Sequence, residues 1–181
     1  MQAISYRKIA SSMYDMPQSD EEILHYTLEE LLPEGHTLAM NVLLGTLSLI
    51  ANDSNLPHPR MVAEQQFTLS ELSLLLPLLN AHPHYCPYEV LLASFNHRMI
   101  TEATIERCRK RLQDAQDEGV WDQEMRPVRN VLSRTRLKMR SFGVEIASIL
   151  ETGYVLMTPP ARKQLGVLQI PSSLRNETNM K

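Results

Sequence analysis

Six basic residues and no acidic one lie in the stretch RPVRNVLSRTRLKMR, which runs from 126 to 140. Arginine can donate two parallel hydrogen bonds to the major-groove edge of guanine, and asparagine pairs in the same way with adenine. Four of these side chains fall on successive turns of one helical face. The residues predicted to contact bases are Arg129, Asn130, Ser133 and Arg134.

The remaining basic side chains of the stretch are predicted to hold phosphates, which position a protein on a duplex without carrying sequence information. They are Arg126, Arg136, Lys138 and Arg140. Thr152 is expected at the tip of a following hairpin, where it can reach the minor groove or the backbone. Glu151 beside it is unfavourable near phosphate, so this tip is expected to contribute little. The alternative for each arginine is an ordinary solvated position.

Charge is divided unevenly along the 181 residues, although the formal net charge is only −3. Residues 1–66 hold three basic and nine acidic residues, whereas residues 126–181 hold ten basic and three acidic ones. This asymmetry indicates that the C-terminal third meets an anion, and nucleic acid is the polyanion that it favours. A solvated helix face is the bland alternative.

A helix must position these side chains, and the apolar spacing within the stretch predicts one. Pro127 suits the first turn of a helix. Apolar or small side chains recur at i, i+3, i+4, i+7 and i+11, which places them on one inward face. They are Val128, Val131, Leu132, Thr135 and Met139. The next segment, VEIASILETGYVLM, predicts a β-hairpin that turns at Thr152-Gly153.

Three further helices are expected before this one. The first covers 67–83, with Thr68 or Ser70 as its cap and Pro77 as a kink or early end. A short helix covers 86–95. A polar helix covers 101–119, where basic residues 107–111 alternate with acids and predict a face of ion pairs. A second DNA-contacting helix is the alternative for that cluster.

The N-terminal region is also predicted to be helical. A capping box at Ser19 and Glu22 opens a helix over 19–32. A second helix over 37–50 is apolar nearly all round, so it must be buried in its own domain or in a partner. The proline-rich segment that follows indicates a linker. The two N-terminal helices are therefore expected to form a homodimer or to bind another protein.

The order helix, helix, basic helix and hairpin resembles the OmpR/PhoB-type winged-helix DNA-binding domain over about 67–157. FTLSELSLLLPLL resembles the first-helix pattern Leu-Thr-x-x-Glu-x-x-Leu-Leu of that family, and YEVLLASF resembles its second helix. The recognition-helix pattern is matched at Val128, Leu132, Arg136, Lys138 and Met139. The wing pattern is matched at Ile146, Ser148, Ile149, Gly153, Tyr154 and Leu156.

The chain also departs from that family. Arg129 replaces its aspartate, Thr135 its leucine and Glu151 its first wing glycine. The helix at about 101–118 is extra, because the family has a short loop there that contacts RNA polymerase in some members. The family carries a four-stranded sheet before its first helix, for which RMVAEQQF supplies one strand at most. No receiver domain is indicated.

These observations predict a mainly α fold with a small β-hairpin wing: a winged helix-turn-helix domain preceded by an N-terminal helical region. The expected divisions are a helical dimerisation or partner-binding region at 1–55, a linker at 56–66, the winged-helix domain at 67–157 and a flexible tail at 158–181. The predicted function is sequence-specific binding of double-stranded DNA by a cytoplasmic, nucleoid-associated bacterial transcription regulator. RNA polymerase or another regulator is a further candidate partner. The alternative is a winged-helix adaptor that binds proteins and not DNA.

Other functional classes find little support in the sequence. There is no phosphate-binding loop, nucleophile elbow or pair of histidines on a helix, so we expect no enzyme. No cofactor is expected, and the histidines lack the spacing of metal ligands. Cys86 and Cys108 are expected to be reduced thiols. The longest apolar region, 38–51, is too short and polar to span a bilayer, and no secretion signal is visible at the start.

Overall fold

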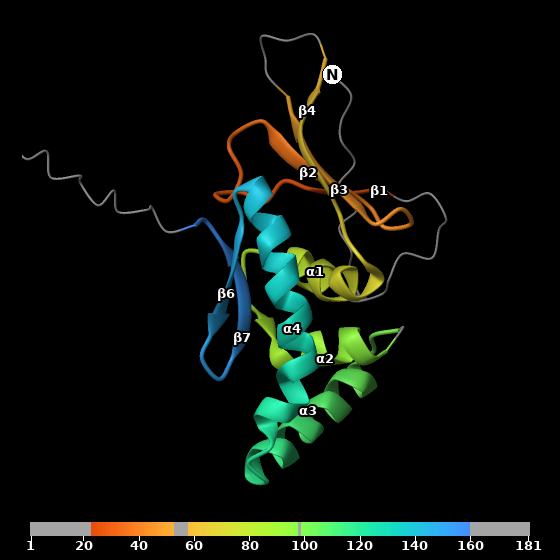
Figure 1. Ribbon diagram of the computed structural model, residues 1–181, viewed down its shortest axis with the longest axis vertical. Helices are drawn as coiled ribbons and strands as arrows, with labels where there is room; N and C mark the ends of the chain where they lie inside the picture. The colour runs from red at the N-terminus through yellow and green to blue at the C-terminus, as the bar shows by residue number, and fades with distance from the viewer. Residues whose placement is uncertain (1–22, 53–57, 98, 160–181) are drawn as a thin grey trace, which may run out of the picture.

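The computed structural model describes residues 23–52, 58–97 and 99–159, and shows a mixed α/β arrangement (Figure 1). In chain order the elements are β1 (Ile23–Tyr26), β2 (His36–Asn41), β3 (Thr46–Ala51), β4 (Arg60–Gln66), α1 (Leu69–Ala81), β5 (Cys86–Pro87), α2 (Tyr88–Asn96), α3 (Glu102–Asp117), α4 (Trp121–Met139), a 3-10 turn (Arg140–Phe142), β6 (Glu145–Ile149) and β7 (Gly153–Met157). The prediction of a mainly α fold whose only β structure is a hairpin is therefore wrong.

The N-terminal region forms an antiparallel sheet in the order β1-β2-β3-β4, and the helices predicted over 19–32 and 37–50 are wrong where the structure describes them. The side chains along each strand point alternately to the two faces of the sheet. The register places Leu38 opposite Leu49 and Met40 opposite Leu47, and all four side chains are buried. On the other face Ser48 donates a hydrogen bond to Glu64. The predicted homodimer through N-terminal helices thus loses its structural basis.

A tight turn explains why residues 37–50 resemble an all-round apolar helix. Leu43 and Leu44 lie between β2 and β3 and are 67% and 61% exposed, so they belong to neither face of the sheet. Gly45 ends the turn at a φ of +67°, a conformation that glycine adopts without strain. These apolar turn residues join the apolar residues of the two strands into one continuous run, in which the alternation typical of a strand is no longer visible.

The predicted linker is partly a strand as well. Residues 60–66 form β4, which pairs with β3, so RMVAEQQF supplies one strand. Most of the linker predicted at 56–66 therefore belongs to the sheet. Residues 1–22, 53–57 and 160–181 lie outside the described part of the chain. The capping box at Ser19 and most of the predicted tail fall there.

The helices agree more closely with the sequence pattern. Thr68, one of the two predicted caps, caps α1, and Glu71 completes a capping box with it. Pro77 lies inside α1 without ending it. Helix α3 occupies the position of the extra helix, and α2 follows Pro87. Helix α4 begins at Trp121, so the expectation that Pro127 lies in its first turn is wrong.

The predicted hairpin is present as β6 and β7, and β5 joins it to make a three-stranded sheet in the order β5-β7-β6. Gly153 lies where β7 meets β5, and a Cβ at this position would overlap the carbonyl oxygen of Cys86. Glycine is therefore required by a close approach of two backbones. Tyr88 holds the hairpin against the helices, because its hydroxyl donates to the carbonyl of Ile149 at 3.1 Å and its ring lies edge-on to that of Tyr154.

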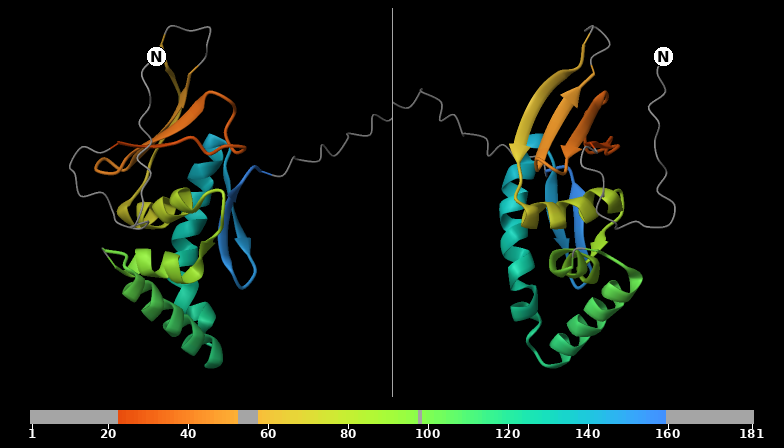
Figure 2. Two further views of the ribbon diagram at one scale, coloured as in Figure 1. Left: turned by 180° about the vertical axis from the view of Figure 1, so that it is seen from behind. Right: turned by 90° about the vertical axis from the view of Figure 1, so that its right-hand side faces the viewer.

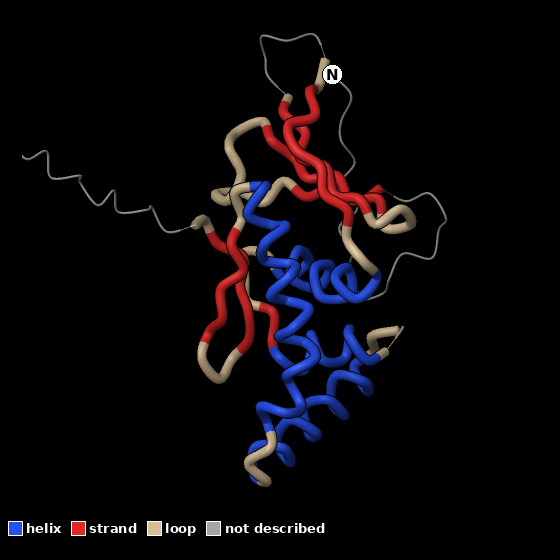
Figure 3. Tube along the Cα trace, in the orientation of Figure 1, coloured by secondary structure: helices blue, strands red, loops and turns tan. Residues whose placement is uncertain are grey.

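The elements are arranged around α4. The four-stranded sheet lies at one end of the molecule and α3 at the other, while the β6–β7 hairpin runs beside α4 in both views of Figure 2. Figure 3 shows the strands of the N-terminal sheet gathered above the helices. One core cluster includes residues of the N-terminal sheet, of all four helices and of the hairpin. The whole framework thus fixes one side of α4 and leaves the other open.

Candidate nucleic-acid interface

Helix α4 has one buried face and one exposed face. Its buried side chains are Met125, Val128, Val131, Leu132, Thr135 and Met139. The predicted inward face is therefore confirmed. The hydroxyl of Thr135 donates to the carbonyl of Val131 at 3.0 Å, so this polar group is satisfied inside the core.

The exposed face carries four of the predicted DNA-binding residues. Arg126, Asn130, Ser133 and Arg134 are all exposed. Within the described ranges, neither Arg126 nor Arg134 forms an ion pair or a side-chain hydrogen bond. Their guanidinium groups are therefore available to a ligand without breaking an existing contact.

Arg129 is engaged at the start of its own helix. One of its Nη atoms lies 2.8 Å from Oδ1 of Asp122 and 2.9 Å from the carbonyl oxygen of the same residue. Its guanidinium also stacks over the ring of Trp121, at 5.4 Å from the centroid. Since Asp122 is largely exposed, this ion pair is weak, but it directs Arg129 along the helix towards Trp121.

Arg136 joins α4 to the hairpin. Its Nε donates to the carbonyl oxygen of Ile146 at 2.7 Å, and its guanidinium lies 5.3 Å from the ring centre of Tyr154. Burial raises the pKa of the Tyr154 hydroxyl. Arg136 is therefore held against both strands of the hairpin.

Lys138 joins α4 to the start of α1. Its Nζ lies 2.6 Å from Oε2 of Glu71 and 2.8 Å from the carbonyl oxygen of Gln66. Glu71 is only 2% exposed and also accepts a hydrogen bond from the N–H of Thr68 at 2.8 Å. Burial opposes the charged form of Glu71, but the hydrogen bonds from Lys138 and Thr68 outweigh it and hold the pKa of this carboxyl below its usual range.

The other two predicted residues lie at the edge of the surface. Arg140 pairs with Glu145 on β6 through two hydrogen bonds of 2.8 and 3.3 Å, and its side chain remains 55% exposed. Thr152 lies at the hairpin turn, where its hydroxyl donates to the carbonyl of Leu150 at 3.0 Å. Glu151 beside it has a φ of +55°, so the turn contains a left-handed residue that is not glycine.

The sequence did not reveal which basic residues have internal partners. Of the six between 126 and 140, four form ion pairs or side-chain hydrogen bonds with the described part of the protein and two form none with it. Of these contacts, only the capping box has a local sequence signal. In that motif Glu71 is the residue whose side chain reaches back to the N–H of Thr68 at the helix start. Its second partner, Lys138, is 67 residues away.

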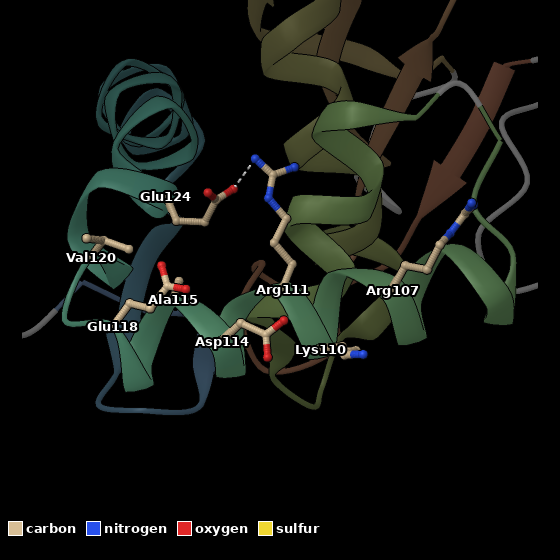
Figure 4. A pocket seen from close by; sticks show the side chains of 8 residues that line it. All are labelled: Arg107, Lys110, Arg111, Asp114, Ala115, Glu118, Val120 and Glu124. Atoms are coloured by element: carbon tan, nitrogen blue, oxygen red, sulfur yellow. Dashed lines mark ion pairs between the residues drawn. The ribbon is translucent and has the colours of Figure 1, made fainter.

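The predicted ion-pair face of α3 is confirmed. Arg109 pairs with Glu106 on its own helix and with Glu89 on α2. Arg111 reaches Glu124 near the start of α4 at 2.6 Å, across a shallow pocket of about 320 Å³ (Figure 4). Three basic and three acidic side chains line this pocket, so it offers no surface of a single charge.

No cluster of histidine, cysteine and acidic residues suited to a metal ion occurs within residues 23–52, 58–97 and 99–159. Cys86 and Cys108 are free thiols in the interior. Among the described helices, none has the length and apolar character needed to cross a membrane. Comparison with protein-family models, with curated proteins and with solved structures finds no significant match.

Proposed function

We propose that this protein binds double-stranded DNA and reads its sequence with the exposed face of α4. One observation carries the proposal: Arg126 and Arg134 project from the same helix face as Asn130 and Ser133, and have no internal partner among the described residues. These are side-chain types that hydrogen-bond to base edges and phosphates. Regulation of transcription is the process in which such binding would act.

The dimensions of this face suit the major groove. Arg126 and Arg134 are separated by eight residues, or about 12 Å of helix rise, and a helix with its side chains is about 10–12 Å in diameter. The major groove of B-DNA is about 12 Å wide and accepts a helix. In this arrangement Asn130, Ser133 and Arg134 face the bases and Arg126 faces the bases or the near phosphates. Arg140 can join them if it exchanges Glu145 for a phosphate.

Two features of the fold support the proposal. The hairpin β6–β7 lies beside α4, where a wing would flank the groove (Figure 1). A four-stranded sheet precedes α1, as the resemblance to OmpR/PhoB-type domains implies. The extra helix α3 departs from that resemblance. It lies away from the hairpin and leaves the exposed face of α4 open.

The proposal is tested by selecting duplexes from a random-sequence library with the full chain. The affinity for the selected site is then measured by fluorescence anisotropy at two salt concentrations. We expect affinity to fall as salt rises, because bound counterions are released from phosphates. Arg134→Ala should cost about 1–3 kcal/mol and relax preference at one base position. Arg107→Ala, which removes an exposed arginine of α3, is the matched control and should leave binding unchanged.

Absence of duplex binding at low salt, or affinity indifferent to salt, would contradict the proposal. An equal loss on every sequence with Arg134→Ala would make Arg134 a phosphate contact instead of a base contact.

A second candidate function, a protein-binding adaptor, is favoured by a different observation. Leu43, Leu44 and Leu69 are 67%, 61% and 78% exposed around a groove of about 470 Å³ that Phe67 and Leu72 also line. An exposed apolar cluster is typical of a protein-binding surface. This function predicts that Arg134→Ala leaves activity in the cell intact, whereas Leu43→Asp abolishes it.

A further inference from the structure

An exposed leucine lies in the middle of the face that we assign to DNA. Leu137 is 65% exposed, although it belongs to the helix whose other aliphatic side chains, the two methionines, two valines and Leu132, are buried. At about 100° per residue, Leu137 lies about 20° round the helix from Arg126 and between Ser133 and Asn130. It is therefore central to the polar face and not at its margin.

We infer that Leu137 contacts the C5-methyl group of a thymine in the bound site, and that the preferred sequence carries a thymine at that position. The inference rests on the proposed function. Among the atoms that base pairs present in the major groove, the thymine methyl is the apolar one, whereas the others are hydrogen-bond donors and acceptors. A leucine inserted there has that methyl as its natural partner.

The position of Leu137 along the helix supports a base contact. It lies one turn after Ser133 and three residues after Arg134, which corresponds to about 6 Å and 4.5 Å of helix rise. If Arg134 hydrogen-bonds to a guanine, a thymine within about two base pairs of it lies within reach of Leu137. The neighbouring basic side chains, Arg136 and Lys138, are held on the hairpin and on α1, so they do not cover the leucine.

The surroundings of Leu137 on the helix are polar. A single exposed leucine is common on protein surfaces, but this one is surrounded by arginine, serine and asparagine on a surface that lacks other exposed apolar side chains of α4. Leu43, Leu44 and Leu69, in contrast, gather around the groove between the β2–β3 turn and α1. The two kinds of exposed leucine therefore differ in their surroundings.

The experiment removes the methyl group from the DNA and the leucine from the protein. In the site selected by the full chain, each thymine is replaced in turn by uracil, which lacks only the C5-methyl. Affinities are measured for the wild type and for Leu137→Ala. We expect uracil at one position to weaken the wild type about fourfold, the effect of exposing one methyl-sized group. The same replacement should leave Leu137→Ala unaffected.

Leu69→Ala is the matched control, because it removes an even more exposed leucine, 78% against 65%, that lies outside the face, and it should keep the full sensitivity to uracil. The inference is overturned if no uracil replacement weakens the wild type, or if Leu137→Ala is weakened as much as the wild type. In those outcomes salt-dependent, sequence-selective binding still stands. If the wild type binds no duplex at all, the proposed function fails together with the inference.

Discussion

Replacement of Lys138 separates a structural role from a DNA-binding one. The Lys138 ammonium is the cationic partner of a Glu71 carboxylate that is only 2% exposed, at 2.6 Å. Removing one partner of a fully buried ion pair costs about 3–5 kcal/mol, because the other charge is left buried. Here Lys138 is 29% exposed, and Glu71 keeps the hydrogen bond from the N–H of Thr68. We therefore expect Lys138→Ala to lower the free energy of unfolding by about 2–3 kcal/mol.

The free energy of unfolding is measured by urea titration and circular dichroism, with the slope compared between variants to show that the same surface unfolds. Arg134→Ala is the control. Its side chain is exposed and has no ion pair within the described ranges, so it should change stability by less than about 0.5 kcal/mol. Arg134 and Lys138 are close in sequence and carry the same charge. Arg134→Ala should nevertheless lower DNA affinity and keep stability, whereas Lys138→Ala should lower stability.

A double-mutant cycle assigns the cost to the pair. Glu71→Gln removes the charge and keeps an amide oxygen that can still accept from Thr68, as glutamine does in a capping box. In this background Lys138→Ala should be about 1–2 kcal/mol less harmful than in the wild type, which is the usual size of coupling between residues in contact.

The pair also predicts a pH dependence. Because the pKa of Glu71 is lower in the folded state than in the unfolded chain, its stabilising effect is complete above the unfolded value of about 4.3. It is lost as the pH falls through the folded value. The stability advantage of the wild type over Glu71→Gln should therefore shrink below about pH 4. A cost of Lys138→Ala below about 0.5 kcal/mol, with lost DNA affinity, would refute this reasoning and make Lys138 a phosphate contact.

Two further predictions concern β5. Gly153→Ala should destabilise the fold by about 3 kcal/mol, the upper end of overpacking, because its Cβ meets the Cys86 backbone and not a movable side chain. Gly119→Ala, with open space but a φ of +71°, should cost only about 1 kcal/mol; equal costs in urea titration would contradict the close approach. Burial raises the pKa of Cys86 to about 12, so iodoacetamide at pH 8 should label Cys86 and Cys108 slowly in the native protein and quickly in urea. Fast native labelling, followed by mass spectrometry, would show that these thiols are accessible.

The elements that the sequence predicts well are those with strong local signals. Helix α1 has a capping box and repeated leucines, α3 and α4 have clear apolar faces, and the hairpin has a turn between two apolar strands. In each case the side chains that specify the element lie within a few residues of one another. The period of 3.6 or 2 is then visible in one short window.

The N-terminal sheet has no such signal. Its buried pairs, Leu38–Leu49 and Met40–Leu47, follow the alternation of strands, but apolar turn residues separate them. Leucine is also a better helix former than the β-branched residues typical of strands. These residues form a sheet because two segments pair with each other, and a short stretch of sequence taken alone does not show that pairing. The same limit applies to Lys138, whose partner Glu71 is distant in sequence and close in space.

The internal partners of α4 bear on the proposed recognition. Arg136 holds the hairpin and Lys138 holds α1, so these two basic residues fix the helix against two other elements, while Arg129 stacks on Trp121 within α4. A helix held in this way loses little freedom on binding, which favours affinity and selectivity. Charges that are paired inside also add less to non-specific attraction by phosphates. In the proposed complex, selectivity therefore rests on a few free side chains presented by a rigid helix, and not on the total positive charge between residues 126 and 140.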